Sequence, residues 1–226
     1  MKGWDPSTAV SHPPGTVVRV FVLGIDPGLT RCGYSVVEGH GRQARALALG
    51  VLTTPASDPL PTRLADLQRD IRALLVEFTP EVVAVERVLF QVNVRTAMSV
   101  GQASGIAMAE AAAAGCDVVQ YSPNEVKQAV AGYGGASKEQ VQVMVQTLLG
   151  LAVLPQPPDA ADAAALALTH LAMATSPAVT HGREPVRRDA GGAPADPPAP
   201  RAGAGQVKNA VGRAPRPAPS IPGAQR

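Results

Sequence analysis

The chain has 226 residues, 46% of them hydrophobic and 3% aromatic, and a formal net charge of +2. This length allows one domain of ordinary size with tails, and its core must be built mainly from Val, Leu, Ile and Ala. Two cysteines outside any CxxC or Cys/His pattern argue against a structural zinc site, and without a long apolar stretch or a signal peptide we expect a cytoplasmic protein with no membrane span.

The first part of the chain predicts a flexible extension followed by three strands. Residues 1–16 are polar and contain three prolines, whereas the valine-rich stretch 17–25 predicts a strand that ends before the turn Pro27-Gly28. Residues 33–38 and 43–54 predict two more strands. Because short turns link all three, we expect an antiparallel meander.

The middle of the chain alternates between helix and strand. Residues 61–78 place apolar side chains on one stripe at helical spacing, and the all-apolar run before Glu86 predicts a buried central strand over 82–86. Residues 93–114 predict a long helix with an Ala- and Gly-rich face that another backbone can approach closely. A short strand is expected at 117–121.

The last third predicts helices with clear starting signals. Ser122-Pro123-Asn124-Glu125 combines a capping residue, a first-position proline and a third-position acid. Ser137 is expected to cap a helix over 138–149. A proline cluster at 155–158 then leads into an alanine-rich helix that runs to about residue 174.

The composition changes after residue 175. Residues 176–226 contain ten Pro, seven Gly and no aromatic residue, so we expect a disordered tail beyond a folded domain over 17–175. The tail has eight basic and three acidic residues. Its arginines either add non-specific attraction for DNA or only keep the tail solvated.

Four carboxylates stand where ordinary surface charge explains them poorly. Asp26 and Glu86 each end an apolar run, and Asp159 and Asp162 are three residues apart, so both face the same way on a helix. If the two runs are adjacent parallel strands, their carboxyl ends meet where open α/β sheets place ligands. Such oxygen ligands suit Mg²⁺ or Mn²⁺, and two ions about 3.5–4 Å apart can hold the attacking and leaving oxygens of a phosphodiester.

Each carboxylate also has a simpler interpretation. Asp26 suits a turn or a helix cap, and Asp159 suits a cap after Pro157-Pro158. Asp162 suits the first turn of a helix, where the dipole favours acids. Glu86 is harder to explain, because Glu is disfavoured in an apolar strand. The metal-site hypothesis fails only if all of these simpler interpretations are correct at the same time.

Four blocks resemble RuvC-type Holliday junction resolvases. Their order along the chain is that of the family, and together they cover about residues 19–174. The first block is Val22-Leu23-Gly24-Ile25-Asp26-Pro27-Gly28-Leu29-Thr30-Arg31-Cys32-Gly33-Tyr34, and the others are Val85-Glu86-Arg87-Val88 with Gly101-Gln102-Ala103, Val126-Lys127-Gln128-Ala129-Val130 with Lys138, and Pro158-Asp159-Ala160-Ala161-Asp162-Ala163.

The resemblance implies a ribonuclease-H-like α/β fold, with a mixed sheet flanked by helices, and a homodimer. It further implies paired symmetric nicking of four-way DNA junctions in recombination and repair, together with a branch-migration helicase complex. The cofactor would be two Mg²⁺ ions per active site, replaceable by Mn²⁺, and the implied metal ligands and catalytic residues are Asp26, Glu86, Asp159 and Asp162.

The resemblance also indicates residues that contact DNA. Lys127 and Lys138 match basic residues that the family places near DNA, although both also suit a solvated helix face. The family has an aromatic junction wedge three residues after the glutamate, whereas this chain has Leu89 there and Phe90 next. Either Phe90 stacks after a small loop shift, Leu89 acts as an apolar wedge, or Phe90 packs in the core.

Three other functions compete with this interpretation. The turn Asp26-Pro27-Gly28-Leu29-Thr30 also resembles the phosphate loop of actin-like kinases, but those enzymes need a duplicated domain and a second loop. A relative of the same fold that cuts RNA or another branched DNA, and a non-catalytic junction-binding protein, are the remaining alternatives. His170 lies about two helical turns beyond Asp162 and is not an obvious general base.

Overall fold

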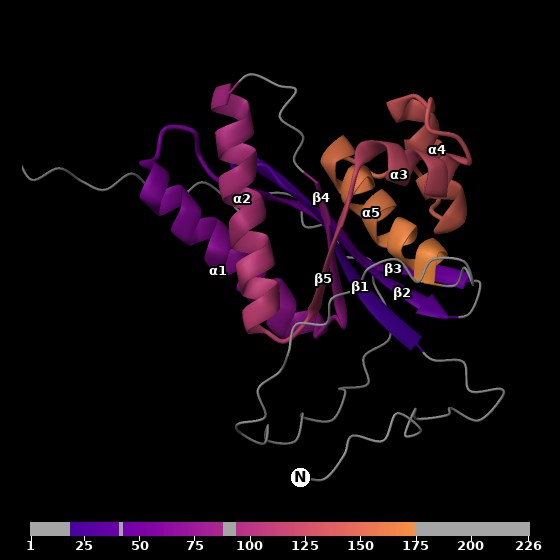
Figure 1. Cartoon of the computed structure of the whole chain (residues 1–226), viewed down its shortest axis with the longest axis horizontal. Coiled ribbons are helices and arrows are strands. Elements are labelled where there is room, and N and C mark those ends of the chain that lie inside the picture. Colours follow the sequence, from indigo (N-terminus) through magenta and orange to yellow (C-terminus); the bar gives the residue numbers. More distant parts are fainter. Residues whose placement is uncertain (1–18, 41–42, 88–93, 175–226) are drawn as a thin grey trace, which may run out of the picture.

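The computed structural model describes residues 19–40, 43–87 and 94–174, which form a five-stranded sheet with helices on both faces (Figure 1). The sheet order is β3-β2-β1-β4-β5. The predicted extension (1–16) and the predicted disordered tail (176–226) lie outside the described residues. The strands are β1 (Arg19–Asp26), β2 (Arg31–His40), β3 (Gln43–Thr53), β4 (Val82–Glu86) and β5 (Asp117–Tyr121).

The strand pairing confirms the predicted mixed sheet. β1 pairs antiparallel with β2, and β2 pairs antiparallel with β3, which is the expected meander. β4 is parallel to both β1 and β5. Ile25 of β1 is in register with Val85 of β4, so the two apolar runs are adjacent parallel strands that end at the same edge.

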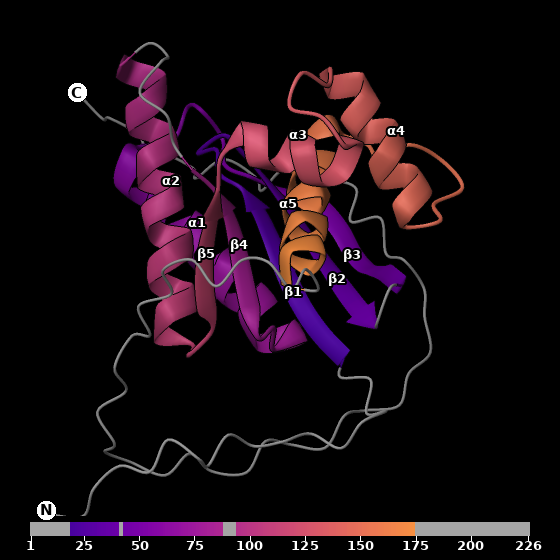
Figure 2. The same cartoon turned by 45° about the vertical axis from the view of Figure 1, so that its right-hand side comes forward.

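Two groups of helices cover the two faces of the sheet. In Figures 1 and 2, α1 and α2 lie on one side of the sheet, and α5 lies against the other face with α3 and α4 packed on it. The helices are α1 (Leu60–Phe78), α2 (Val94–Ala113), α3 (Pro123–Ala131), α4 (Lys138–Leu148) and α5 (Pro158–Ala174). None of the described helices combines the length and the apolar composition needed to cross a membrane.

Each face of the sheet has its own core. Successive strand residues point to opposite faces, so Val22 packs in the core beneath α5, whereas Leu23 packs in the core beneath α1 and α2. Both side chains are fully buried. Burying one such side chain stabilises the fold by about 1.5–3 kcal/mol. This two-sided burial explains why the run that leads to Asp26 is apolar at every position.

The helix starts follow the predicted signals. The Ser122 hydroxyl accepts a hydrogen bond from the Glu125 N–H at 3.3 Å, and the Glu125 carboxylate accepts one from the Ser122 N–H at 2.7 Å. Ser137 caps α4 in the same reciprocal way with Gln140. These caps fix where α3 and α4 begin, and Lys138 is the first residue of α4.

The predicted boundaries differ from the structure mainly in β2. The hydrophobic pattern predicted a strand over 33–38, but the ladder extends from Arg31, paired with Thr53, to His40, paired with Gln43. Polar residues at both ends hide this extension from a pattern based on apolar residues. The longer strand places Arg31 at the edge of the sheet where β1 ends.

Candidate active site

Two of the candidate carboxylates meet at the carboxyl edge of the sheet. Asp26 is the last residue of β1 and Glu86 the last of β4, and the parallel register brings the two strand ends side by side. The two carboxyl groups also interact electrostatically, since the negative charge of Glu86 raises the pKa of Asp26.

The other two carboxylates lie in the first turns of α5, which packs directly on the sheet. A Cβ atom at Gly33 would lie 2.1 Å from the carbonyl oxygen of Asp159, and one at Gly24 would lie 2.0 Å from that of Ala163. A larger side chain at either glycine would therefore push the helix away. This close approach brings Asp159 and Asp162 towards the ends of β1 and β4, as their electrostatic coupling to Asp26 confirms.

Each α5 carboxylate has a cation of its own. The Arg31 guanidinium donates from Nη2 at 2.8 Å and from Nε at 3.2 Å to the same carboxylate oxygen of Asp159. The Lys138 ammonium lies 2.6 Å from a carboxylate oxygen of Asp162. The sequence assigned Lys138 to DNA and left Arg31 without a role, so the structure adds both residues to the surroundings of the carboxylates.

The electrostatics show an excess of buried negative charge. Burial first, and then repulsion from the other three carboxylates, raises the pKa of Asp26 to about 7. Burial and the charge of Asp162 also raise the pKa of Glu86. The pKa of Asp162 is raised by burial, against the opposing effect of Lys138. Asp159 differs, because the hydrogen bond from Arg31 lowers its pKa.

The donor chemistry of this site fits a hard divalent cation. All four groups offer carboxylate oxygens, and a dication would offset the charge that raises the pKa of Asp26. Within the described ranges, however, no three Asp, Glu, His or Cys side chains are already arranged so that they could coordinate a metal ion. Two of the carboxylates are instead bound to Arg31 and Lys138. A metal ion would have to compete with those contacts.

The remaining predicted contact residues are placed only in part. Lys127 is half-buried on α3 and, in the described part of the chain, forms no ion pair. Leu89 and Phe90 lie outside the described residues, so the choice between an aromatic wedge, an apolar wedge and a core role remains a prediction. His170 is buried, and its Nδ1 atom lies 2.9 Å from the Tyr121 hydroxyl. This position agrees with the expectation from its spacing that His170 is not an obvious general base.

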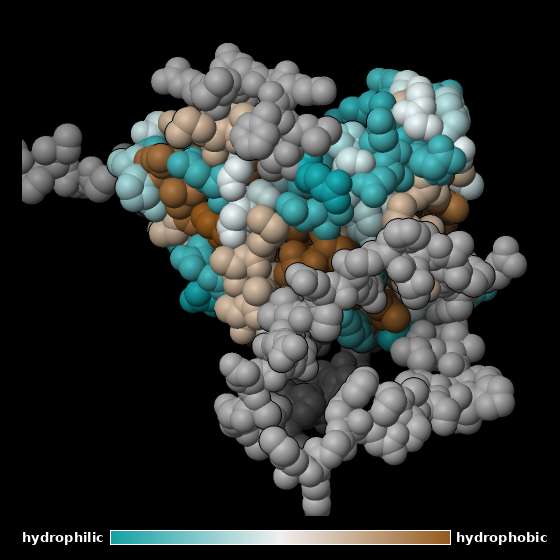
Figure 3. Space-filling view, viewed as in Figure 1, coloured by the Kyte–Doolittle hydropathy of each residue, from teal (hydrophilic) through white to brown (hydrophobic). Residues whose placement is uncertain are grey.

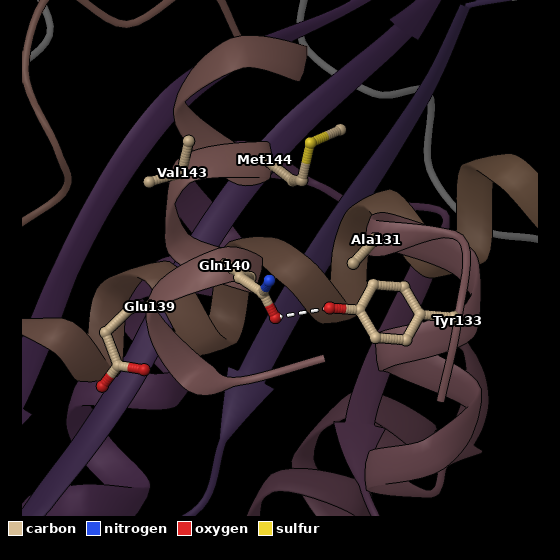
Figure 4. Close-up of a pocket in the computed structure, with 6 residues that line it drawn as sticks. All are labelled: Ala131, Tyr133, Glu139, Gln140, Val143 and Met144. Carbon is tan, nitrogen blue, oxygen red and sulfur yellow. Dashed lines mark hydrogen bonds between the residues drawn. The ribbon is translucent and has the colours of Figure 1, made fainter. Parts of the chain in front are cut away.

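A separate hollow lies between α3 and α4. It has a volume of about 350 Å³ and is lined by Ala131, Tyr133, Glu139, Gln140, Val143 and Met144 (Figure 4). The Tyr133 hydroxyl donates to the Gln140 side chain across it at 2.6 Å, the dashed line in Figure 4. None of the four candidate carboxylates lines this hollow, so it is not the site that they form.

This mixed five-stranded sheet flanked by helices is a ribonuclease-H-like fold of the kind found in RuvC-type resolvases. The chain belongs to the family described as crossover junction endodeoxyribonuclease RuvC, whose sequence profile matches residues 22–170. The matched segment begins within β1, ends within α5 and includes all four carboxylates.

Individual relatives agree with this assignment. A RuvC endonuclease of Salinispora arenicola is 54% identical over 151 residues, which is 66% of this chain and 86% of that protein. One from Syntrophomonas wolfei is 47% identical over 150 residues, covering 66% of this chain and 87% of the relative. The solved structure of Thermus thermophilus RuvC in complex with Holliday junction substrate has a TM-score of 0.66 and 41% identity, covering 69% of this chain and 95% of that one.

Proposed function

We propose that this chain is a structure-selective endonuclease that resolves four-way DNA junctions by hydrolysing phosphodiester bonds in recombination and repair. The observation that carries the proposal is the group of four coupled carboxylates at one sheet edge, within a chain that belongs to the RuvC family. The complex of a 41%-identical relative with a Holliday junction supports the choice of substrate.

Asp26, Glu86, Asp159 and Asp162 would hold the metal, Mg²⁺ or in its place Mn²⁺, with two ions expected per site. Bound there, divalent metal supplies an activated water and neutralises charge at phosphorus and on the leaving oxygen. The chain's own part is to position the four carboxylates: β1 and β4 fix Asp26 and Glu86, and the glycine contacts fix the first turns of α5.

The DNA would be held by other groups. Lys127 and Lys138 are proposed to contact phosphates, and either Leu89 or Phe90 is proposed to act at the junction centre. Lys138 would then serve two partners, since it also binds Asp162. The basic tail after residue 175 would add non-specific attraction.

The assembly is proposed to be a homodimer. Two equivalent sites related by a two-fold axis match a four-way junction, which itself has approximate two-fold symmetry, and they would produce paired nicks. A branch-migration helicase complex is the proposed partner, and the cytoplasm the proposed compartment.

The test is cleavage of a four-way junction by Glu86→Gln and Asp159→Asn variants with Mg²⁺ present and absent. We expect each variant to lose at least about 100-fold in cleavage rate, since even changes outside the metal ligands cost 10–100-fold. Junction binding should remain, because binding relies on basic groups. Glu77→Gln, an exposed acid on α1, is the matched control and should cut normally.

Linear duplex and RNA substrates measured in the same assay decide between the alternatives. Faster cleavage of RNA or of another branched DNA would favour a relative of different specificity. Tight junction binding without Mg²⁺-dependent cleavage by the wild-type protein would favour a non-catalytic binding protein. Near wild-type cleavage by either acid variant would overturn the metal-ligand assignment.

A further inference from the structure

Arg31 makes the only two-nitrogen contact to a candidate metal ligand within the described residues. Its Nε and Nη2 atoms both donate to one oxygen of Asp159. The two residues are 128 positions apart, on β2 and α5. Charge-assisted hydrogen bonds from a guanidinium are stronger than neutral ones, so this contact holds the Asp159 oxygen against other partners.

The backbone that carries Arg31 is fixed independently of this ion pair. Arg31 is in register with Thr53 on β3, and Arg63 of α1 donates to the hydroxyl of the preceding residue, Thr30, at 2.7 Å. Arg63 also donates to Thr54, whose N–H bonds back to the Thr30 carbonyl. The guanidinium can therefore leave Asp159 without disturbing the turn.

The Arg31 side chain can also move into solvent when it leaves Asp159. It is 47% exposed, whereas the Asp159 side chain is 26% exposed. An exposed ion pair contributes little net stability, because solvent competes for both groups. The contact is thus strong enough to compete for the Asp159 oxygen and weak enough to exchange.

We propose that Arg31 is an internal counter-ion that competes with a divalent cation for Asp159, and so sets the metal affinity of the site as a positioning residue. This rests on Asp159 being a metal ligand, as proposed above. The positive charge of Arg31 both occupies a carboxylate oxygen and repels an incoming cation. Removing that charge should therefore tighten metal binding, the opposite of what the loss of a structural support would do.

The experiment is a calorimetric titration of the full-length protein with Mn²⁺ in the absence of DNA. Arg31→Gln is expected to lower the Mn²⁺ dissociation constant about 1.5- to fivefold, the range that corresponds to an exposed charge pair. Arg31→Lys keeps the charge but not the two-nitrogen contact, and should fall between Arg31→Gln and the wild type. Arg69→Gln, which removes an exposed arginine paired with acids on α1, should leave the constant unchanged.

A double variant tests whether the effect passes through Asp159. In Arg31→Gln combined with Asp159→Asn, the gain from losing Arg31 should shrink to the part that comes from repulsion of the cation, because the competition for the Asp159 oxygen is already gone. If a variant is too dilute for calorimetry, the increase in its unfolding midpoint on addition of Mn²⁺ gives the same comparison of metal affinity.

Two failures can be told apart. If Asp159→Asn binds Mn²⁺ as tightly as the wild type, the metal-ligand assignment itself is wrong. If Asp159→Asn binds weakly but Arg31→Gln binds no tighter than the wild type, the assignment stands and the counter-ion role of Arg31 is overturned.

Discussion

Asp26 shows at the scale of one residue how burial beside other carboxylates destabilises the charged form of an acid. It ends a strand whose other residues are largely buried, and it faces three further carboxylates. Burial penalises the charged form, and like charges penalise it further. The folded chain therefore holds Asp26 partly protonated at neutral pH, with a pKa of about 7.

Asp26→Asn should stabilise the protein when EDTA removes divalent cations. In the folded wild type the pKa of Asp26 is about 7, above its ordinary value of 3.8. Protonation of Asp26 therefore stabilises the fold fully below pH 3.8, and this stabilisation is lost as the pH rises through 7. At pH 8 we expect the variant to be more stable by on the order of 2 kcal/mol. The gain should shrink at pH 5, where the folded wild type is protonated. Thermal unfolding at both pH values measures this, and a lower melting temperature for the variant at pH 8 would contradict it.

At the scale of elements, the contact between α5 and the sheet decides where two of the four carboxylates lie. The helix is buried from Ala160 to His170 except at Asp162, and it is rich in alanine on the side of β1 and β2. Small side chains on the helix and glycines on the strands let the two backbones approach closely. Glycine is required at Gly24 and Gly33 because a side chain would collide with α5, and not because of an unusual backbone conformation, since neither residue has a positive φ.

Gly33→Ala should therefore damage both the fold and the site. The added methyl group would lie 2.1 Å from the Asp159 carbonyl, so the first turn of α5 must shift. Overpacking of this kind costs about 1–3 kcal/mol, measurable by urea unfolding. Mn²⁺ affinity should fall as well, because Asp159 moves with the helix.

Gly134→Ala is the control for this substitution, because a Cβ there meets nothing within 4 Å and Gly134 has no positive φ. Its unfolding midpoint and Mn²⁺ affinity should match the wild type. If Gly33→Ala also matched the wild type in both measurements, the close contact would have no role in placing Asp159.

The sequence was sufficient for those features that depend on local pattern. Apolar runs that end in an acid predicted Asp26 and Glu86 at one sheet edge, and the spacing of Asp159 and Asp162 predicted a shared helical face. Arg31 was missed because its partner lies 128 residues away, and an ion pair between distant elements leaves no periodic trace in the sequence. The ends of β2 were missed for a related reason, since polar residues there are held by ladder hydrogen bonds rather than by burial.

At the scale of the whole molecule, α2 presents a face suited to a second copy of the chain. Met98 is 61% exposed, and a Cβ at Gly101 or Gly105 would meet nothing within 4 Å. Figure 3 shows weakly hydrophobic residues along α2, beside more hydrophobic ones over α1. Small residues allow two helices to approach closely, which agrees with the proposed homodimer.

Met98→Arg should weaken that dimer. A buried, unpaired charge at an interface costs several kcal/mol, so we expect a shift towards monomer at micromolar concentration in analytical ultracentrifugation. Single nicks should then replace paired nicks in the junction assay. Val153→Arg changes a residue that is 73% exposed between α4 and α5, and should leave the dimer intact. A wild-type protein that is monomeric and fully active would contradict the dimer itself.

The position of α5 in the chain has a consequence for biosynthesis. A ribosome delivers the N-terminus first, at about 5–20 residues per second, so β1 and β4 emerge long before Asp159 and Asp162. A chain interrupted before residue 158 contains every strand of the described sheet but only half of the carboxylates. Unfinished copies of this protein are thus expected to be unable to cut DNA, even if their sheet assembles. The proposed active site can therefore form only after α5 has been synthesised.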